Sequence, residues 1–524
     1  MRRLLFGSAA LLAMTAAAQA QTSVSVGPEK CAELKSLQVP GVAMAITNAQ
    51  WFPAGPAPAQ GPAPAAAPPV QLPAYCRLDG MIDRRQGVGG QYGIGFALSL
   101  PGKWNGRFLM QGGGGLNGRV GLPLGAQAAG GSPALTRGFA VVSTDTGHQS
   151  TTAFDGSFMQ DQQAALDFAF VAIGRVAVLA KEIVARHYGK PADHSYFVGC
   201  STGGREAMLM SQRYPTYFDG IVAGAPAMRT GHSNLSLRSS VVAFNNIAPR
   251  DPSGKPITAQ AFSDADRKTI VDGIVNACDA NDGVKDGMIF DQRSCTFDPA
   301  TLVCKGAKVD GCLSSAQAAA VSKAFAGPKD SKGNPVYTGY YYDTGIAAMG
   351  GGIPGILLGA GPPVGAPAAL AQDVDKEERD VETTAQSVIG DTWSWTNLDT
   401  FAGRGGKLLF YHGVSDPWFS AQDTVGYYER LGKANGGAEV VKNWSRLFLS
   451  PGMGHCQGGA AALDTFDLLT ALVDWVEKGT PPDAVTATGR AFPGRSRPLC
   501  AYPQHAHYKG SGDPQDARNF ECRN

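Results

Sequence analysis

Charged residues are scarce in this chain of 524 residues, and the few that it has are balanced in sign. Asp, Glu, Lys and Arg make up 17% of the sequence, with 45 basic residues against 44 acidic ones. A balanced chain has no excess positive charge with which to bind nucleic acid or an anionic membrane surface. We therefore expect no nucleic-acid partner.

Long apolar runs and internal repeats are also lacking after the N-terminus, which excludes a multi-span membrane protein and a repeat architecture. The one candidate run, Leu4–Ala18, follows two arginines and ends in Ala18-Gln19-Ala20. A basic start, a short apolar stretch and an A-x-A site are typical of a secretory signal peptide. We predict that residues 1–20 are such a peptide. The mature protein is then periplasmic or secreted, with no membrane-spanning part.

Export affects the interpretation of the ten cysteines, because oxidising compartments favour disulfides and ten cysteines permit up to five. The sequence does not determine which cysteines pair. Close spacing favours three local pairs and allows a fourth that ties down the N-terminal segment: Cys278–Cys295, Cys304–Cys312, Cys500–Cys522 and Cys31–Cys76. Cys200 and Cys456 are then left over.

Short apolar runs alternate with helical patterns from Gln91 onward, as in a mainly parallel α/β sheet flanked by helices. The runs end at glycine or polar residues, as buried parallel strands do. The expected strands are 107–111, 139–143, 195–199, 220–224, 407–411 and 446–450. The expected helices are 161–188, 206–213, 421–431 and 462–478.

This alternation lapses between about Met228 and Asp399, which suggests an insertion. We predict a catalytic domain made of residues 91–227 and 400–524, with residues 228–399 inserted as a lid over one edge of the sheet. Residues 21–90 form an N-terminal segment, and its proline-rich part, 53–73, is expected to be an extended surface loop.

The strongest motif is Gly199-Cys-Ser-Thr-Gly203, a G-x-S-x-G sequence between an expected strand and an expected helix. Small neighbours allow the strained turn that projects a serine hydroxyl from the end of a strand. An ordinary glycine-rich turn is the alternative. Ser201 is therefore the candidate nucleophile.

A serine nucleophile needs a histidine base that a carboxylate orients. In this strand-turn-helix arrangement the chain order is Ser, acid, His. Asp416 and His455 each directly follow an expected strand, at the sheet edge where catalytic groups gather. We expect Ser201, Asp416 and His455 to form a triad. For Asp416, capping of the turn before Pro417 is the alternative.

The leftover cysteines flank two of these candidates, since Cys200 precedes Ser201 and Cys456 follows His455. A disulfide between them would hold the two side chains in register.

Acyl transfer also needs donors for a developing oxyanion. The backbone N–H of Thr202 is one candidate, and the glycine-rich loop 111–118 offers another at Gly115, with its neighbour Gly114 beside it. A phosphate-binding loop is the competing interpretation, but no Lys-Ser/Thr follows.

A second cluster, the acidic loop of residues 278–290, brings Asp279, Asp282 and Asp286 close together in the sequence. Oxygen ligands in a tight loop suit Ca²⁺, and the carbonyls of Val284 and Met288 would complete the shell. The spacing is not that of an EF-hand. A solvated acidic turn is the alternative, and a structural role is expected for the ion.

With these motifs the chain resembles the tannase and feruloyl esterase family of α/β hydrolases. The residues that carry the resemblance are Pro-Gly-Lys-Trp-Asn-Gly-Arg at 101–107, Gly-Cys-Ser-Thr-Gly-Gly-Arg at 199–205, Cys-Asp-Ala-Asn-Asp-Gly-Val-Lys-Asp-Gly at 278–287, His-Gly-Val-Ser-Asp at 412–416 and Gly-Met-Gly-His-Cys at 452–456.

The resemblance implies an α/β-hydrolase fold with a lid, and it implies the triad, oxyanion and calcium assignments above. It also implies the Cys200–Cys456 bridge together with the four other disulfides. His412 and Phe419 match substrate-pocket positions. Gly114, the neighbour of Gly115 in the glycine-rich loop, is also expected to contact the substrate.

Within the family, the resemblance is strongest to hydrolases of mono(2-hydroxyethyl) terephthalate, which grip a free carboxylate with a lid arginine. Between residues 330 and 400 this chain has one arginine, Arg379, inside a charged run, and position 202 is Thr instead of Glu.

The sequence thus predicts a secreted, monomeric serine carboxylesterase that forms an acyl-enzyme. Its expected substrates are small aromatic esters of feruloyl, galloyl or mono(2-hydroxyethyl) terephthalate type. A general short-chain esterase with an open site is one alternative. A non-catalytic, calcium-stabilised binding protein on the same scaffold is the other.

Overall fold

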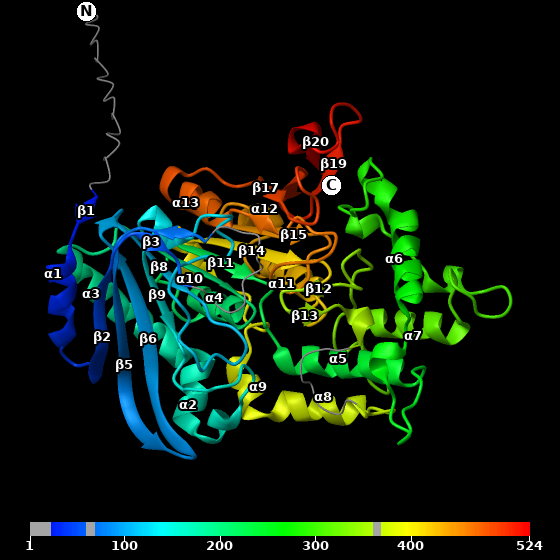
Figure 1. The fold of residues 1–524 in the computed structure, drawn as a ribbon, viewed down its shortest axis with the longest axis horizontal. Coiled ribbons are helices and arrows are strands. Elements are labelled where there is room, and N and C mark those ends of the chain that lie inside the picture. The colour runs from blue at the N-terminus through cyan, green and yellow to red at the C-terminus, as the bar shows by residue number, and fades with distance from the viewer. Residues whose placement is uncertain (1–22, 59–68, 360–367) are drawn as a thin grey trace, which may run out of the picture.

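A nine-stranded sheet forms the centre of the protein (Figure 1). The computed structural model describes residues 23–58, 69–359 and 368–524, so the predicted signal peptide and part of the proline-rich segment lie outside it. The strand order is β15-β14-β11-β10-β8-β9-β6-β5-β2.

The six strands from β15 to β9 run parallel. They are the apolar runs that the sequence predicts, and each is buried on both faces of the sheet. Their bounds are β8 (Arg107–Gln111), β9 (Ala140–Thr144), β10 (His194–Cys200), β11 (Gly220–Gly224), β14 (Lys407–Gly413) and β15 (Ser445–Ser450).

Three antiparallel strands, which the sequence analysis did not predict, extend one edge of the sheet. They are β2 (Met44–Phe52), β5 (Tyr75–Gly87) and β6 (Gly90–Pro101). Much of the N-terminal segment is therefore part of the sheet. The described ends of the proline-rich segment pair as β3 (Gly55–Pro56) and β4 (Gln71–Leu72).

Helices cover both faces of the sheet. One apolar core lies under α3 (Ala172–Tyr188), α4 (Thr202–Gln212) and α11 (Ala421–Ala434). A second core lies under α13 (Leu468–Lys478), which begins six residues later than predicted because the Asp467 carboxylate caps it by accepting from the Thr470 N–H. A π-helical turn over Asp167–Val171 separates α2 (Gln162–Leu166) from α3, where the sequence predicts one continuous helix.

The segment between β11 and β14 forms a separate helical layer with its own apolar core, seen on the right of Figure 1. Its first helices are α5 (Thr230–Asn245), α6 (Asp264–Cys278) and α7 (Ser315–Ala326). Capping boxes at Ser263 and Ser314 fix the starts of α6 and α7. The helices α8 (Val374–Thr383), α9 (Ala385–Gly390) and α10 (Asp399–Gly403) lead back to the sheet.

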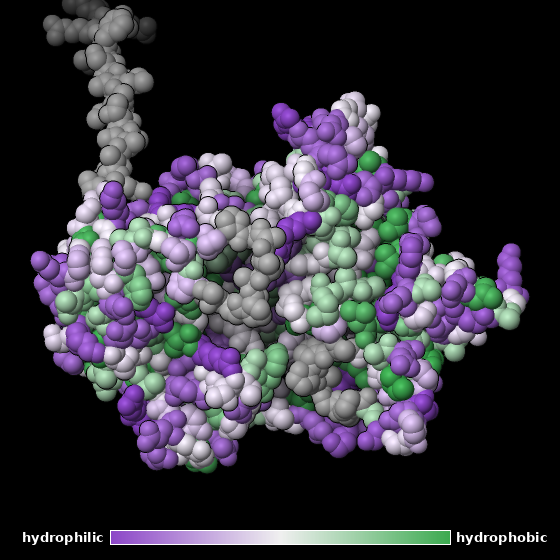
Figure 2. Space-filling model, viewed as in Figure 1, coloured by the Kyte–Doolittle hydropathy of each residue, from purple (hydrophilic) through white to green (hydrophobic). Residues whose placement is uncertain are grey.

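This arrangement, a mainly parallel sheet with helices on both faces and an insertion after β11, is the α/β-hydrolase fold. All ten cysteines are paired, in the five combinations named above. Figure 2 shows hydrophobic residues on this face only as small separate patches. Over the described ranges, no helix has the length and apolar character needed to cross a bilayer.

Candidate active site

Ser201 lies in a strained turn between β10 and α4. Its φ of 63° and ψ of −124° lie in a region of backbone conformation that residues other than glycine rarely adopt. The turn is held by hydrogen bonds from the Ser201 N–H to the Gly224 carbonyl (3.1 Å) and from the Ala227 N–H to the Ser201 carbonyl (3.1 Å). The G-x-S-x-G motif thus has the strand-turn-helix context predicted for it.

The flanking glycines are required by close packing of backbone against backbone. A Cβ added at Gly199 would lie 2.3 Å from the Gly203 carbonyl oxygen, and one added at Gly203 would lie 2.7 Å from the Gly113 carbonyl oxygen. The glycine-rich loop after β8 therefore packs directly against the serine turn.

Asp416 and His455 form a buried pair at the carboxyl ends of β14 and β15. The His455 Nδ1 and the Asp416 Oδ2 are 2.7 Å apart. The Asp416 Oδ1 accepts from the backbone N–H groups of Trp418 (2.9 Å) and Phe419 (3.1 Å). This fixed carboxylate requires the tautomer with a proton on Nδ1, which leaves Nε2 as an acceptor.

The pKa of the Asp416 carboxyl lies well below its ordinary value. Burial raises it, but the electrostatic interaction with His455 and hydrogen bonds from His412 and His455 outweigh that effect. Asp416 is therefore ionised at neutral pH.

His412 is fully buried behind Asp416, and neither cavity described below includes it in its lining. Its Nε2 lies 2.9 Å from the Phe419 carbonyl oxygen and 3.4 Å from the Asp416 Oδ2, and its Nδ1 lies 2.8 Å from the Thr424 Oγ1. The structure thus places His412 in support of the Asp416 loop, where the resemblance implied contact with substrate.

The Cys200–Cys456 disulfide joins the residue before Ser201 to the residue after His455, with 6.0 Å between the Cα atoms. It links loops separated by 256 positions in the sequence.

The glycine-rich loop 111–118 is held by groups that sequence reasoning missed. The buried Glu206 accepts from the Gly113 N–H (3.0 Å) and from the Asn117 Nδ2 (2.6 Å). The Thr202 hydroxyl donates to the Gly115 carbonyl oxygen, so the two predicted oxyanion residues are in contact. As the first residue of α4, Thr202 has a backbone N–H without an intrahelical acceptor.

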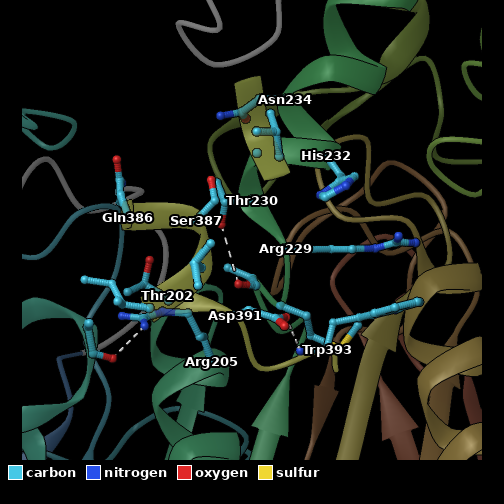
Figure 3. A pocket seen from close by; sticks show the side chains of 18 of the residues that line it. Thr202, Arg205, Arg229, Thr230, His232, Asn234, Gln386, Ser387, Asp391 and Trp393 are labelled. Carbon is cyan, nitrogen blue, oxygen red and sulfur yellow. Dashed lines mark hydrogen bonds between the residues drawn. The ribbon is translucent and has the colours of Figure 1, made fainter. Parts of the chain in front are cut away.

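Ser201 lines two cavities. The first, of about 790 Å³, extends beneath the insertion and is lined by Phe154, Trp393, Trp418, Phe419 and polar groups around them. Figure 3 labels Trp393 and the polar side chains. The second, of about 480 Å³, is lined by Gly114, His455 and Gln457, among others. Gly115, Phe154 and Trp418 line both. Aromatic rings also surround the histidine, since the Trp418 and Phe419 ring centroids lie 5.9 and 5.4 Å from that of His455.

The acidic loop lies against the C-terminal segment. Asp279 accepts from the Gly287 N–H (3.1 Å), Asp282 accepts from the Phe290 N–H (3.0 Å), and Asp286 pairs with Arg497. Burial, with the charges of the other two aspartates, raises the pKa of Asp282 to about 7. In the part of the chain that the structure describes, no three acidic, His or Cys side chains are arranged as metal ligands.

Comparison with known proteins identifies the family. The model of the tannase and feruloyl esterase family matches residues 80–361 and 364–523. The chain belongs to the tannase and feruloyl esterase family.

Relatives in the tannase and feruloyl esterase family include a mono(2-hydroxyethyl) terephthalate hydrolase of Piscinibacter sakaiensis. It is 38% identical, over 92% of this chain and 89% of its own. A probable feruloyl esterase of Arthroderma benhamiae is 33% identical over 83% of each chain. The crystal structure of feruloyl esterase B from Aspergillus oryzae is similar, with a TM-score of 0.75 at 26% identity over 95% of this chain and all of that one. Membership in the tannase and feruloyl esterase family makes this protein a carboxylic ester hydrolase.

Proposed function

We propose that this protein is a secreted serine esterase that hydrolyses small aromatic esters through an acyl-enzyme. The observation that carries the proposal is the site itself. Ser201, in a strained turn, shares a cavity with His455, whose Nδ1 is 2.7 Å from the Asp416 carboxylate.

In this mechanism the Ser201 Oγ attacks the ester carbonyl while its proton passes to the His455 Nε2. Asp416 keeps the Nδ1 proton in place, because its other oxygen is already fixed by two backbone N–H groups. The backbone N–H groups of Gly115 and Thr202 donate to the oxyanion. His455 then protonates the leaving alcohol, and a water activated by the same histidine releases the acid.

The two cavities receive different parts of the ester. His455 must reach the departing alkoxide and lines only the second cavity, so the alcohol occupies that one. The acyl group then occupies the larger first cavity. Phe154, Trp393, Trp418 and Phe419 give that cavity apolar surface suited to an aromatic ring. Phe419, a predicted substrate residue, thus belongs to the acyl side, and Gly114 belongs to the alcohol side.

The compartment is also part of the proposal. The signal-peptide pattern and five disulfides, a kind of bond that is rare in a reducing cytosol, support export to the periplasm or beyond. We expect the exported protein to be a monomer.

We further propose that the acidic loop binds a structural Ca²⁺ through Asp279, Asp282, Asp286 and the carbonyls of Val284 and Met288. All of these donors are oxygens, and a cation would offset the repulsion among three carboxylates, two of which have raised pKa values. Binding requires Asp286 to share its carboxylate with Arg497 or to turn from it.

The test is a set of initial rates on methyl ferulate, methyl gallate, mono(2-hydroxyethyl) terephthalate and p-nitrophenyl acetate, with Ser201→Ala beside the wild type. The exposed Ser253→Ala is the matched control. We expect turnover of the aromatic esters that S201A abolishes and S253A retains. Preference for the acetate would indicate a general short-chain esterase, and no turnover of any ester would indicate a binding protein.

A further inference from the structure

Around the first cavity the described acidic side chains have no basic ion-pair partners, whereas the basic side chains are already engaged in other contacts. Three acidic residues, Glu378 on α8, Glu382 on the same helix and Asp391 after α9, line it on the side of the insertion. Of the described basic groups, none lies within ion-pair distance of these three carboxylates. Asp391 instead accepts from the backbone N–H groups of Trp393 (2.7 Å) and Ser394 (3.3 Å).

The basic residues of the same cavity are already committed. Arg229 makes a bidentate pair with the buried Asp423 (Nη2 to Oδ1, 2.6 Å; Nε to Oδ2, 3.2 Å). Its guanidinium carbon lies 4.2 Å from the ring centroid of Trp393 and 4.9 Å from that of Tyr337; Figure 3 shows Arg229 and Trp393. A ligand carboxylate would have to displace Asp423 to use it.

Arg205 is the second cation of the lining, and only 4% of its surface is exposed. Its two terminal nitrogens donate to the carbonyl oxygens of Phe168 (2.9 Å) and Ala169 (2.8 Å) in the π-helical turn. The buried carboxyl of Glu206 is next to it in the chain. Arg205 therefore offers a ligand no donor that is both free and accessible.

His232 adds no positive charge at neutral pH, because burial and the charge of Arg229 lower its pKa. Arg430, which donates to the Trp393 carbonyl oxygen, is outside the lining. The residues 360–367, which the structure does not describe, include no charged residue in the sequence.

We propose that the acyl cavity selects aromatic acyl groups that are neutral or cationic at the end away from the ester, and that it discriminates against a free carboxylate there. This inference rests on the proposed function and narrows its substrate class. It removes terephthalate monoesters from the preferred substrates, while esters with phenol, amide or amine substituents remain.

Three 2-hydroxyethyl benzoates with para substituents of different charge test the proposal. They are mono(2-hydroxyethyl) terephthalate, the isosteric 2-hydroxyethyl 4-carbamoylbenzoate and the cationic 2-hydroxyethyl 4-(aminomethyl)benzoate. In low-salt buffer we expect kcat/KM for the neutral ester to exceed that for the anionic one by about tenfold. Repulsion of the substrate carboxylate by the three partly solvated carboxylates of the cavity, each at about 10 Å, would give an effect of this size. We expect the cationic ester to be at least as good as the neutral one. In 1 M NaCl the neutral-to-anionic ratio should fall to about twofold.

The variant Glu378→Gln/Glu382→Gln should lower the neutral-to-anionic ratio by about threefold or more, whereas the exposed Glu439→Gln, on α12 (Ala438–Val441), should leave it unchanged. Equal kcat/KM for the anionic and neutral esters in low salt, or a ratio unaffected by the double variant, would overturn the proposal. Absence of Ser201-dependent turnover of all three esters would instead overturn the proposed function.

Discussion

Replacing Asp416 with Asn should disable the site by fixing His455 in the wrong tautomer. The Asp416 Oδ1 accepts two backbone N–H groups, so in the variant the carbonyl oxygen of the amide must take that position. The opposite orientation would set an NH₂ group against two N–H donors. The amide NH₂ therefore replaces Oδ2 and donates to the His455 Nδ1, which places the ring proton on Nε2, where the Ser201 proton should go.

The expected loss is about 10⁴-fold in kcat, the effect of this change on serine-protease triads, which corresponds to about 5.5 kcal/mol of transition-state stabilisation. The geometry supports a loss of that size. In the 2.7 Å contact the His455 Nδ1 donates to the carboxylate of the wild type but would accept from the amide of the variant, while the packing stays the same.

The assay is the steady-state hydrolysis of p-nitrophenyl acetate and methyl ferulate, with the exposed Asp310→Asn as control. A cooperative thermal transition would show that the D416N protein is folded. If folded D416N retained more than a tenth of the wild-type kcat, the assignment of Asp416 as the residue that orients His455 would be wrong.

Three further predictions concern stability. Replacing Cys200 and Cys456 with Ala should lower the free energy of unfolding, measured by urea titration, by about 5 kcal/mol. The same change at Cys304 and Cys312 should lower it by about 2.5 kcal/mol, because the first disulfide closes a loop of 256 positions and the second a loop of 8. Equal losses would contradict this explanation. Burial raises the pKa of Asp145 to about 7. The folded protein therefore holds this proton more tightly than the unfolded chain does, which stabilises the fold by up to about 4 kcal/mol below about pH 4. That stabilisation is lost as the pH rises towards 7. Asp145→Asn should thus gain stability relative to wild type between pH 4 and pH 8, and a constant difference would refute the shift. Removing Ca²⁺ with EDTA should lower the Tm, and Ca²⁺ but not Mg²⁺ should restore it; a Tm insensitive to both would exclude the proposed ion.

The parallel strands could be predicted from the sequence because a strand buried on both faces is a continuous apolar run. The runs at 107–111 and 220–224 coincide with β8 and β11. The antiparallel strands were harder to predict. Alternate residues of β5 are only partly buried, and its polar positions, such as Arg77 and Asp79, together with Gly80, resemble a loop.

The predicted local geometry of the site is present where one motif carries both a conformation and a chemistry, while the catalytic roles stay predictions. The Ser201 turn and the Asp416–His455 pair are of this kind. The positions of His412 behind Asp416 and of Glu206 under the glycine loop depend on tertiary contacts between distant segments, and neither residue type nor spacing indicates them. The helix predicted from 462 begins at 468, after its Asp467 cap. Ala462 and Leu463 are buried in the loop before it, so apolar character alone was misleading.

The two cavities that meet at Ser201 also impose an order of events on the proposed reaction. Once the alcohol has left, the cavity beside His455 is open to solvent while the acyl group still fills the other. The hydrolytic water then arrives by the route along which the alcohol departed, on the side where the histidine can activate it. A bulky alcohol that is slow to diffuse away would therefore delay the second half of the cycle as well as the first.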